Sequence, residues 1–107
     1  MSIEYYQRII NNLDKEIKDL EARKAKSEKM SSDYQREIDH IERDLSRNKS
    51  GLRDKRKLEQ KILLKNKFIQ EDRRIVGYLK KIYNNRSKRN DAYIKLHKLE
   101  IDLQRNM

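Results

Sequence analysis

The sequence predicts an all-α fold: a long antiparallel two-helix coiled-coil hairpin that assembles with a second copy into a four-helix bundle. Three observations lead to this prediction. Apolar residues recur at alternating steps of three and four, which is the spacing of a coiled-coil seam. The chain has no proline, and each interior proline would destabilise a helix by about 3 kcal/mol. Charged residues make up 43% and hydrophobic residues 35% of the 107 residues, so a thick globular core is excluded.

The first predicted helix covers residues 3–46. Alternating steps of three and four from its start pass through thirteen positions, of which ten are apolar or aromatic. Ser2 is suited to cap the helix, and Glu4 lies in the first turn, where the helix dipole favours a negative charge. The apolar members of this seam are Ile3, Tyr6, Ile10, Leu13, Ile17, Leu20, Tyr34, Ile38, Ile41 and Leu45.

Three successive positions of this seam are polar, namely Lys24, Ser27 and Ser31. Polar residues in a coiled-coil seam lower stability but restrict register or oligomeric state. We therefore expect these three residues to set the register. Folding at the predicted turn would place the serines opposite the region of Phe68 and Ile69 and bring the ammonium group of Lys24 toward Asp72.

The apolar spacing lapses at the predicted turn, residues 47–52, where Asn48, Ser50 and Gly51 offer capping and turn chemistry. We expect the chain to reverse here, with Gly51 at a positive φ that only glycine adopts without steric cost. The alternative is one continuous helix that pairs as a parallel rod. The low helix propensity of this segment favours the hairpin.

The second predicted helix, residues 53–105, has two adjacent apolar stripes. A face this broad needs more than one neighbouring helix, so we expect a homo-oligomer, most simply a dimer of hairpins. An alternative is a helix break within residues 84–87 that creates a third helix. The first stripe contains Leu58, Ile62, Ile69, Val76, Leu79, Tyr83 and Tyr93, and the second contains Phe68, Ile75, Ile82, Leu96 and Leu103.

The formal net charge of +10 lies entirely in the second half of the chain. Residues 1–48 carry 10 Lys and Arg against 11 Asp and Glu, whereas residues 49–107 carry 18 against 7. Basic clusters can bind nucleic acid phosphates, which makes a nucleic-acid-binding protein the alternative function. The clusters surround the helix instead of sharing one side, which favours a solvated face or an acidic protein partner. The candidate nucleic-acid-binding residues are Arg53, Lys55, Arg56, Lys57, Lys80, Lys81, Arg86, Lys88 and Arg89.

Several classes of function find no support in the residues. The chain has no cysteine for disulfides or thiolate metal sites, and it has neither a signal peptide pattern nor an apolar run long enough to span a membrane. We expect a cytoplasmic protein without membrane insertion. Glu37-x-x-His40 is the spacing used in di-iron bundles, but such a site needs a second copy of the motif and further inward glutamates. We therefore expect no metal, no cofactor and no enzymatic activity.

The sequence resembles the helical N-terminal region of bacterial proteins that carry a Toll/interleukin receptor (TIR) domain. The resemblance lies in "MSIEYYQRIINNLDKEIKDLEARKAK", in "IDHIERDLSRNKSGL" and in "KRNDAYIKLHKLE". It implies an assembly element beside an effector that cleaves NAD or signals through TIR contacts, commonly in antiphage defence. This chain contains no TIR domain, so the resemblance implies a scaffold for an attached or partner effector and no NAD chemistry.

A second protein-partner alternative is a helical hairpin that accompanies a bacterial secreted toxin. Proteins of that kind are similar in outline to the predicted hairpin. The Trp-x-Gly turn that would support this alternative is absent from the sequence, which has no tryptophan.

Overall fold

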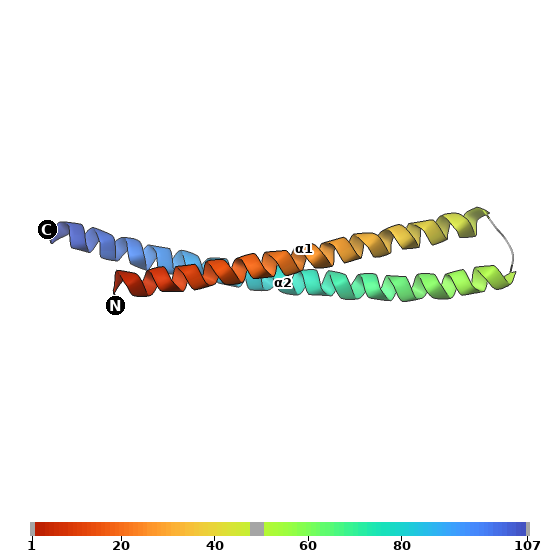
Figure 1. The fold of residues 1–107 in the computed structure, drawn as a ribbon, viewed down its shortest axis with the longest axis horizontal. Helices are drawn as coiled ribbons and strands as arrows, with labels where there is room; N and C mark the ends of the chain where they lie inside the picture. The colour runs from red at the N-terminus through yellow and green to blue at the C-terminus, as the bar shows by residue number, and fades with distance from the viewer. Residues whose placement is uncertain (1, 48–50, 107) are drawn as a thin grey trace. The chain divides into compact units, whose positions relative to one another are not determined.

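The computed structural model describes residues 2–47 and 51–106, with the backbone alone described for residues 51–53. Two helices account for nearly all of them: α1 spans Ile3–Arg47 and α2 spans Gly51–Arg105 (Figure 1). The helices run antiparallel, which confirms the predicted all-α hairpin. α2 is unbroken through residues 84–87, so the alternative of a third helix is wrong.

The residues at the helix ends follow simple electrostatic and capping rules. The backbone N–H of Tyr5 donates to Ser2 Oγ over 3.2 Å, so Ser2 is the N-cap of α1 as expected. Glu4 lies in the first turn of α1 and Arg47 in its last turn, and both signs of charge suit the helix dipole. Near the same C-terminal end, Ser46 Oγ donates to the carbonyl oxygen of Arg43 over 2.7 Å.

The turn differs in one respect from the expectation. Gly51 is the first residue of α2, and no described glycine has a positive φ. The expected left-handed conformation at Gly51 is therefore wrong, because the helix begins earlier than residue 53. Asn48 and Ser50, the other two expected turn residues, lie outside the described residues.

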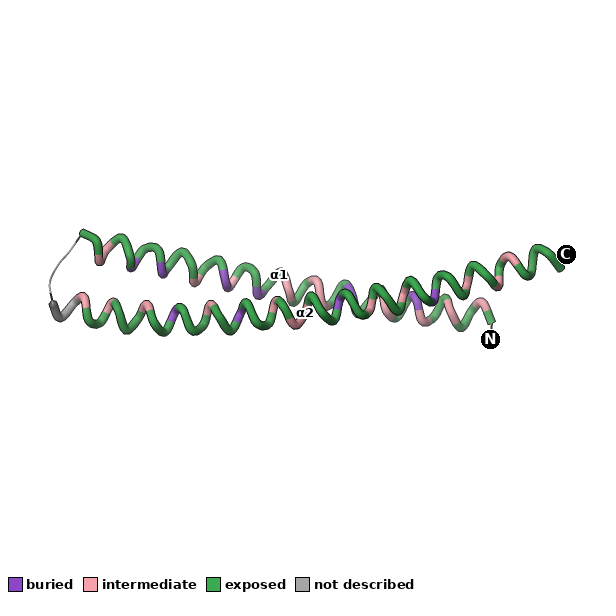
Figure 2. Tube along the Cα trace, turned by 180° about the vertical axis from the view of Figure 1, so that it is seen from behind, coloured by how far each residue is buried: buried purple, intermediate pink, exposed green. Residues whose placement is uncertain are grey.

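The chain divides into two units, each of which is a pair of antiparallel helix segments. Unit 1 joins residues 1–23 to residues 78–107, and unit 2 is residues 24–77. In unit 2 the core is a cluster of Ile38, Ile41 and Leu64, with Tyr34, Leu45 and Phe68 packed against it. In unit 1 the buried apolar residues are Ile10, Ile17, Ile82 and Ala92. Buried positions therefore recur along one side of each helix, and most of the remaining surface is exposed (Figure 2).

Candidate interaction surface

The seam that α1 presents to α2 coincides with the predicted one. All thirteen positions reached by alternating steps of three and four, from Ile3 to Leu45, are buried or half-buried. They include the polar residues Lys24, Ser27 and Ser31, and the two serines are only 5% and 7% exposed. A single narrow seam of this kind is typical of a two-helix coiled coil.

The seam that α2 presents to α1 also follows alternating steps of three and four, but it is not the stripe that apolar residues alone indicate. Fourteen successive positions at this spacing are buried or half-buried. Six of the fourteen are polar or charged, which interrupts the apolar pattern. In unit 2 the seam contains Asp54, Lys57, Lys61, Leu64, Phe68, Glu71 and Ile75, and in unit 1 it contains Tyr78, Ile82, Asn85, Arg89, Ala92, Leu96 and Leu99.

Ion pairs between the helices explain why charged residues are tolerated in the α2 seam of unit 2. Lys57 Nζ lies 3.4 Å from Asp44 Oδ2, and Lys61 Nζ lies 3.0 Å from Glu42 Oε1. Both lysines extend their apolar stems along the seam while the ammonium groups reach carboxylates at its edge. These half-exposed pairs orient the helices more than they stabilise them.

The same arrangement occurs in unit 1, again with the basic partner on α2 and the acidic partner on α1. Arg89 Nη1 lies 2.8 Å from Asp14 Oδ1, and Arg86 Nη2 lies 2.7 Å from Glu21 Oε1. Part of the excess positive charge of α2 is therefore paired with carboxylates of α1 within the hairpin.

A polar layer lies in unit 2 where the α1 seam is interrupted. Ser31 Oγ donates to Asp72 Oδ1 over 3.2 Å, and Glu71 Oε1 accepts from Arg74 Nη1 over 2.8 Å. Ser31 therefore lies level with Asp72, about one helical turn beyond the expected Phe68. Lys24 pairs with Glu28 on its own helix at 2.9 Å, so the expected contact between Lys24 and Asp72 is wrong.

The first of the two predicted stripes of α2 lies on the outer surface of the hairpin, away from α1. Its members each follow a seam position by one residue, which turns them about 100° around the helix and away from α1. All are exposed, from 46% for Ile69 to 74% for Tyr83. Unit 2 carries Leu58, Ile62, Ile69 and Val76, and unit 1 carries Leu79, Tyr83 and Tyr93. We call these seven residues the outer stripe.

The other predicted stripe is the one that faces α1. Ile82 is buried, and Phe68, Ile75 and Leu96 are half-buried, whereas Leu103 is exposed. α2 therefore has two apolar surfaces of different kinds: a seam covered by α1, and an outer stripe that no described residue of the chain covers. The broad apolar face predicted from the sequence is the sum of both.

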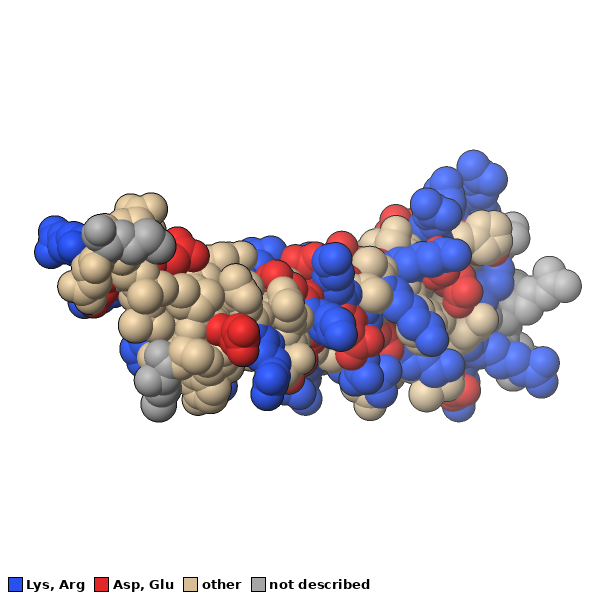
Figure 3. All heavy atoms as spheres, turned by 60° about the vertical axis from the view of Figure 1, so that its left-hand side comes forward, with Lys and Arg blue, Asp and Glu red and all other residues tan. Residues whose placement is uncertain are grey.

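The candidate nucleic-acid-binding residues do not form one free basic surface. Lys57, Arg86 and Arg89 are engaged in the ion pairs with α1, and the side chain of Arg53 lies outside the described part of the structure. The exposed remainder is Lys55, Arg56, Lys80, Lys81 and Lys88. On the face in Figure 3, Lys and Arg are interspersed with Asp and Glu. Nucleic acid binding stays a prediction that this arrangement does not strengthen.

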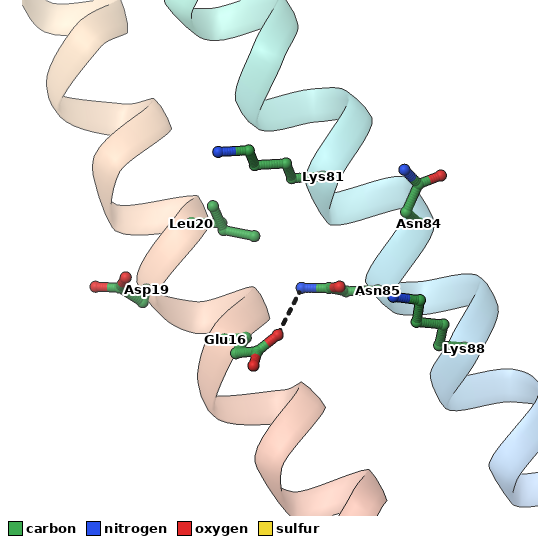
Figure 4. Close-up of a pocket in the computed structure, with 7 residues that line it drawn as sticks. All are labelled: Glu16, Asp19, Leu20, Lys81, Asn84, Asn85 and Lys88. Atoms are coloured by element: carbon green, nitrogen blue, oxygen red, sulfur yellow. Dashed lines mark hydrogen bonds between the residues drawn. The ribbon is translucent and has the colours of Figure 1, made fainter.

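Unit 1 has a surface groove of about 380 Å³ between its two helix segments (Figure 4). Asn85 Nδ2 donates to Glu16 Oε2 across it over 3.2 Å. The other lining residues are Asp19, Leu20, Lys81, Asn84 and Lys88. These residues do not indicate a particular ligand, and we assign the groove none.

The remaining candidate for chemistry is the Glu37-x-x-His40 spacing in unit 2. His40 is exposed, and its Nε2 lies 3.6 Å from Asp44 Oδ2 on the same helix. Within residues 2–47 and 51–106, no group of three or more His, Asp or Glu side chains is placed to hold a metal ion. His40 is thus a surface residue beside one carboxylate.

Comparisons with models of known protein families, with curated proteins and with solved structures find no match for this chain. No helix in the described part of the chain is both long and apolar enough to cross a membrane. The class of protein is therefore defined by fold and surface alone: a two-helix hairpin with an apolar outer stripe on α2.

Proposed function

We propose that this protein is a structural interaction module that self-associates through the outer stripe of α2 and thereby brings attached or partner effector domains together. The observation that carries the proposal is the exposure of this stripe. Its residues lie on the alternating steps of a coiled-coil seam, with Lys65, Asp72, Arg86 and Asn90 at the intervening positions. No helix packs against the stripe residues among the described residues. Apolar surface arranged in this way on a small protein marks an interaction site.

The spacing of the stripe indicates the shape of its partner. Side chains at steps of three and four form a straight apolar line along a helix, and the surface that complements such a line is another helix. A second copy of this chain supplies one. Two hairpins that pair through α2 would form a four-helix assembly in which apolar residues of the stripe are buried in both copies.

The proposal is tested by the mass of the protein in solution. Light scattering after size exclusion, over a series of micromolar concentrations, should give a mass twice the 13.1 kDa of the chain. Replacing Ile62 and Val76 with serine should shift the protein to the monomer, because both residues belong to the outer stripe. A wild-type protein that stays monomeric at all concentrations while fully helical would refute self-association.

Leu63 provides a matched control for this experiment. Leu63 and Ile62 are adjacent in α2 and similarly exposed, at 61% and 60%, but Leu63 lies outside the outer stripe. Leu63→Ser should leave the mass of the dimer unchanged. Equal loss of the dimer in Ile62→Ser and Leu63→Ser would mean that general surface hydrophobicity drives association.

The resemblance to the N-terminal region of bacterial TIR-domain proteins supports a TIR effector as the domain that this module assembles. This part of the proposal is tested independently, by reading the DNA on both sides of the coding sequence. A TIR-coding frame that is fused or adjacent is the expected result. Its absence would remove the TIR assignment and leave the self-association proposal to the solution experiment.

A further inference from the structure

The outer stripe in unit 2 reads nearly the same in both directions along α2. Ile69 lies at its centre, and the apolar residues Ile62 and Val76 lie seven residues to either side. Between them, on the same side of α2, lie two exposed charged residues of opposite sign: Lys65 four residues before Ile69 and Asp72 three residues after it. These five residues form an apolar and charged pattern that is complementary to its own reverse. We call them the self-complementary segment.

The charges of this segment decide between two ways of pairing with a second copy. In a parallel pair in register, Lys65 would face Lys65 and Asp72 would face Asp72, and like charges directly opposite one another are unfavourable. In an antiparallel pair centred on Ile69, each Lys65 faces Asp72 of the second copy. Ile62 then lies level with Val76 of the second copy, and Ile69 with its own equivalent.

The charged residues are available for such contacts. Lys65 is exposed and forms no salt bridge within the described residues. Asp72 is exposed as well, and its Oδ1 accepts one hydrogen bond from Ser31 of its own hairpin. A carboxylate offers several acceptor positions on its two oxygens, so the bond from Ser31 leaves capacity for an ammonium group.

We infer that two copies of this chain pair antiparallel through the self-complementary segment, about a two-fold axis at Ile69, with two reciprocal Lys65–Asp72 ion pairs. The inference rests on the proposed self-association and specifies its orientation and register. A two-fold interface uses the same surface on both copies, which is the property that a pattern complementary to its own reverse provides.

Site-specific disulfide trapping tests the orientation, because the natural chain has no cysteine. The full-length variants Ile62→Cys and Val76→Cys, one of them carrying a mass tag, are mixed and oxidised. The antiparallel pair predicts that the mixed 62–76 dimer exceeds both homodimers several-fold. Homodimers in excess would overturn the inference. Lys67→Cys, on the opposite side of α2, is the control and should cross-link weakly.

Charge reversal provides a second readout that depends on the same register. Lys65→Glu should weaken dimerisation about tenfold, because each of two attractive pairs becomes a repulsive one. Adding Asp72→Lys to the same chain restores opposite charges and should recover most of the affinity, with helicity measured by circular dichroism in each variant. Failure of the double variant to recover, with helicity intact, would overturn the register.

The two proposals can fail separately. A dimeric wild-type mass together with homotypic cross-links would retain self-association and remove the antiparallel pairing. A monomeric wild-type protein would remove both.

Discussion

Glu71 occupies a seam position of α2 that coiled coils usually fill with an apolar residue, and it is only 4% exposed. Arg74 donates to one carboxylate oxygen, but Oε2 is buried without a hydrogen-bond partner in the described structure. A buried polar atom that lacks a partner destabilises the folded state by about 1–3 kcal/mol. Glu71 therefore limits the stability of unit 2 and contributes to the polar layer that distinguishes one register from others.

Replacing Glu71 with leucine should raise the free energy of unfolding by about 1–3 kcal/mol, because it removes a buried charge and extends the apolar seam. Urea denaturation followed by circular dichroism measures this change. Gln70→Leu, at the adjacent exposed position, is the control and should have little effect. A lower stability for Glu71→Leu would show that the polar layer stabilises the hairpin.

One isoleucine from each apolar surface of the protein allows the two surfaces to be compared. Ile38 is 2% exposed in the core of unit 2, and Ile62 is 60% exposed on the outer stripe. Ile38→Ala should lower the free energy of unfolding by about 2 kcal/mol or more, because it leaves a cavity between the helices. Ile62→Ala should leave hairpin stability nearly unchanged, when measured at concentrations where the protein is monomeric, and should weaken dimerisation.

Denaturation curves and light scattering on both variants provide the two readouts. Identical losses of hairpin stability in the two variants would contradict the assignment of these residues to different surfaces.

At the scale of the helix, α1 was predictable from the sequence, since ten of its thirteen seam positions are apolar or aromatic. α2 was predictable as a helix but its two surfaces could not be told apart. Lys57, Lys61, Glu71, Asn85 and Arg89 occupy seam positions, so counting apolar residues favours the outer stripe. The sequence does not show which residues of α1 and α2 pair. The polar and charged residues of the α2 seam are tolerated only where they lie beside carboxylates or other polar seam residues of α1.

The register between the two helices also could not be predicted from the sequence alone. The expected contact between Ser31 and the region of Phe68 is displaced by about one turn in the structure, where Ser31 donates to Asp72. Capping residues identify the turn only to within a few positions, and α2 starts two residues before the expected position 53. Each residue added to the start of α2 changes which side chains of α2 lie level with a given side chain of α1.

At the scale of the molecule, charge opposes the proposed dimer. The residues of α2 carry 17 Lys and Arg against 7 Asp and Glu, which equals the net charge of +10 of the whole chain. Pairing through the outer stripe brings two copies of this basic helix together. Added salt screens such repulsion, since the Debye length falls from about 10 Å at 0.1 M to about 3 Å at 1 M. Dimer affinity should therefore rise with salt concentration.

Sedimentation equilibrium across a salt series measures this dependence. The prediction also separates the two functions considered for the basic helix, because binding to nucleic acid phosphates weakens steeply as salt increases. A dimer that dissociates on addition of salt would indicate that ion pairs, and not the apolar stripe, hold the copies together.

The most direct test of the account is a distance between equivalent positions of two copies. A single nitroxide at Glu59, an exposed residue of α2 that is ten residues from Ile69, leaves the outer stripe intact. Antiparallel pairing about Ile69 predicts a separation of about 30 Å or more by dipolar electron spin resonance, from the 1.5 Å rise per residue on both helices. A separation within about 20 Å would indicate parallel helices side by side, and absence of dipolar coupling in a fully helical protein would contradict self-association through α2.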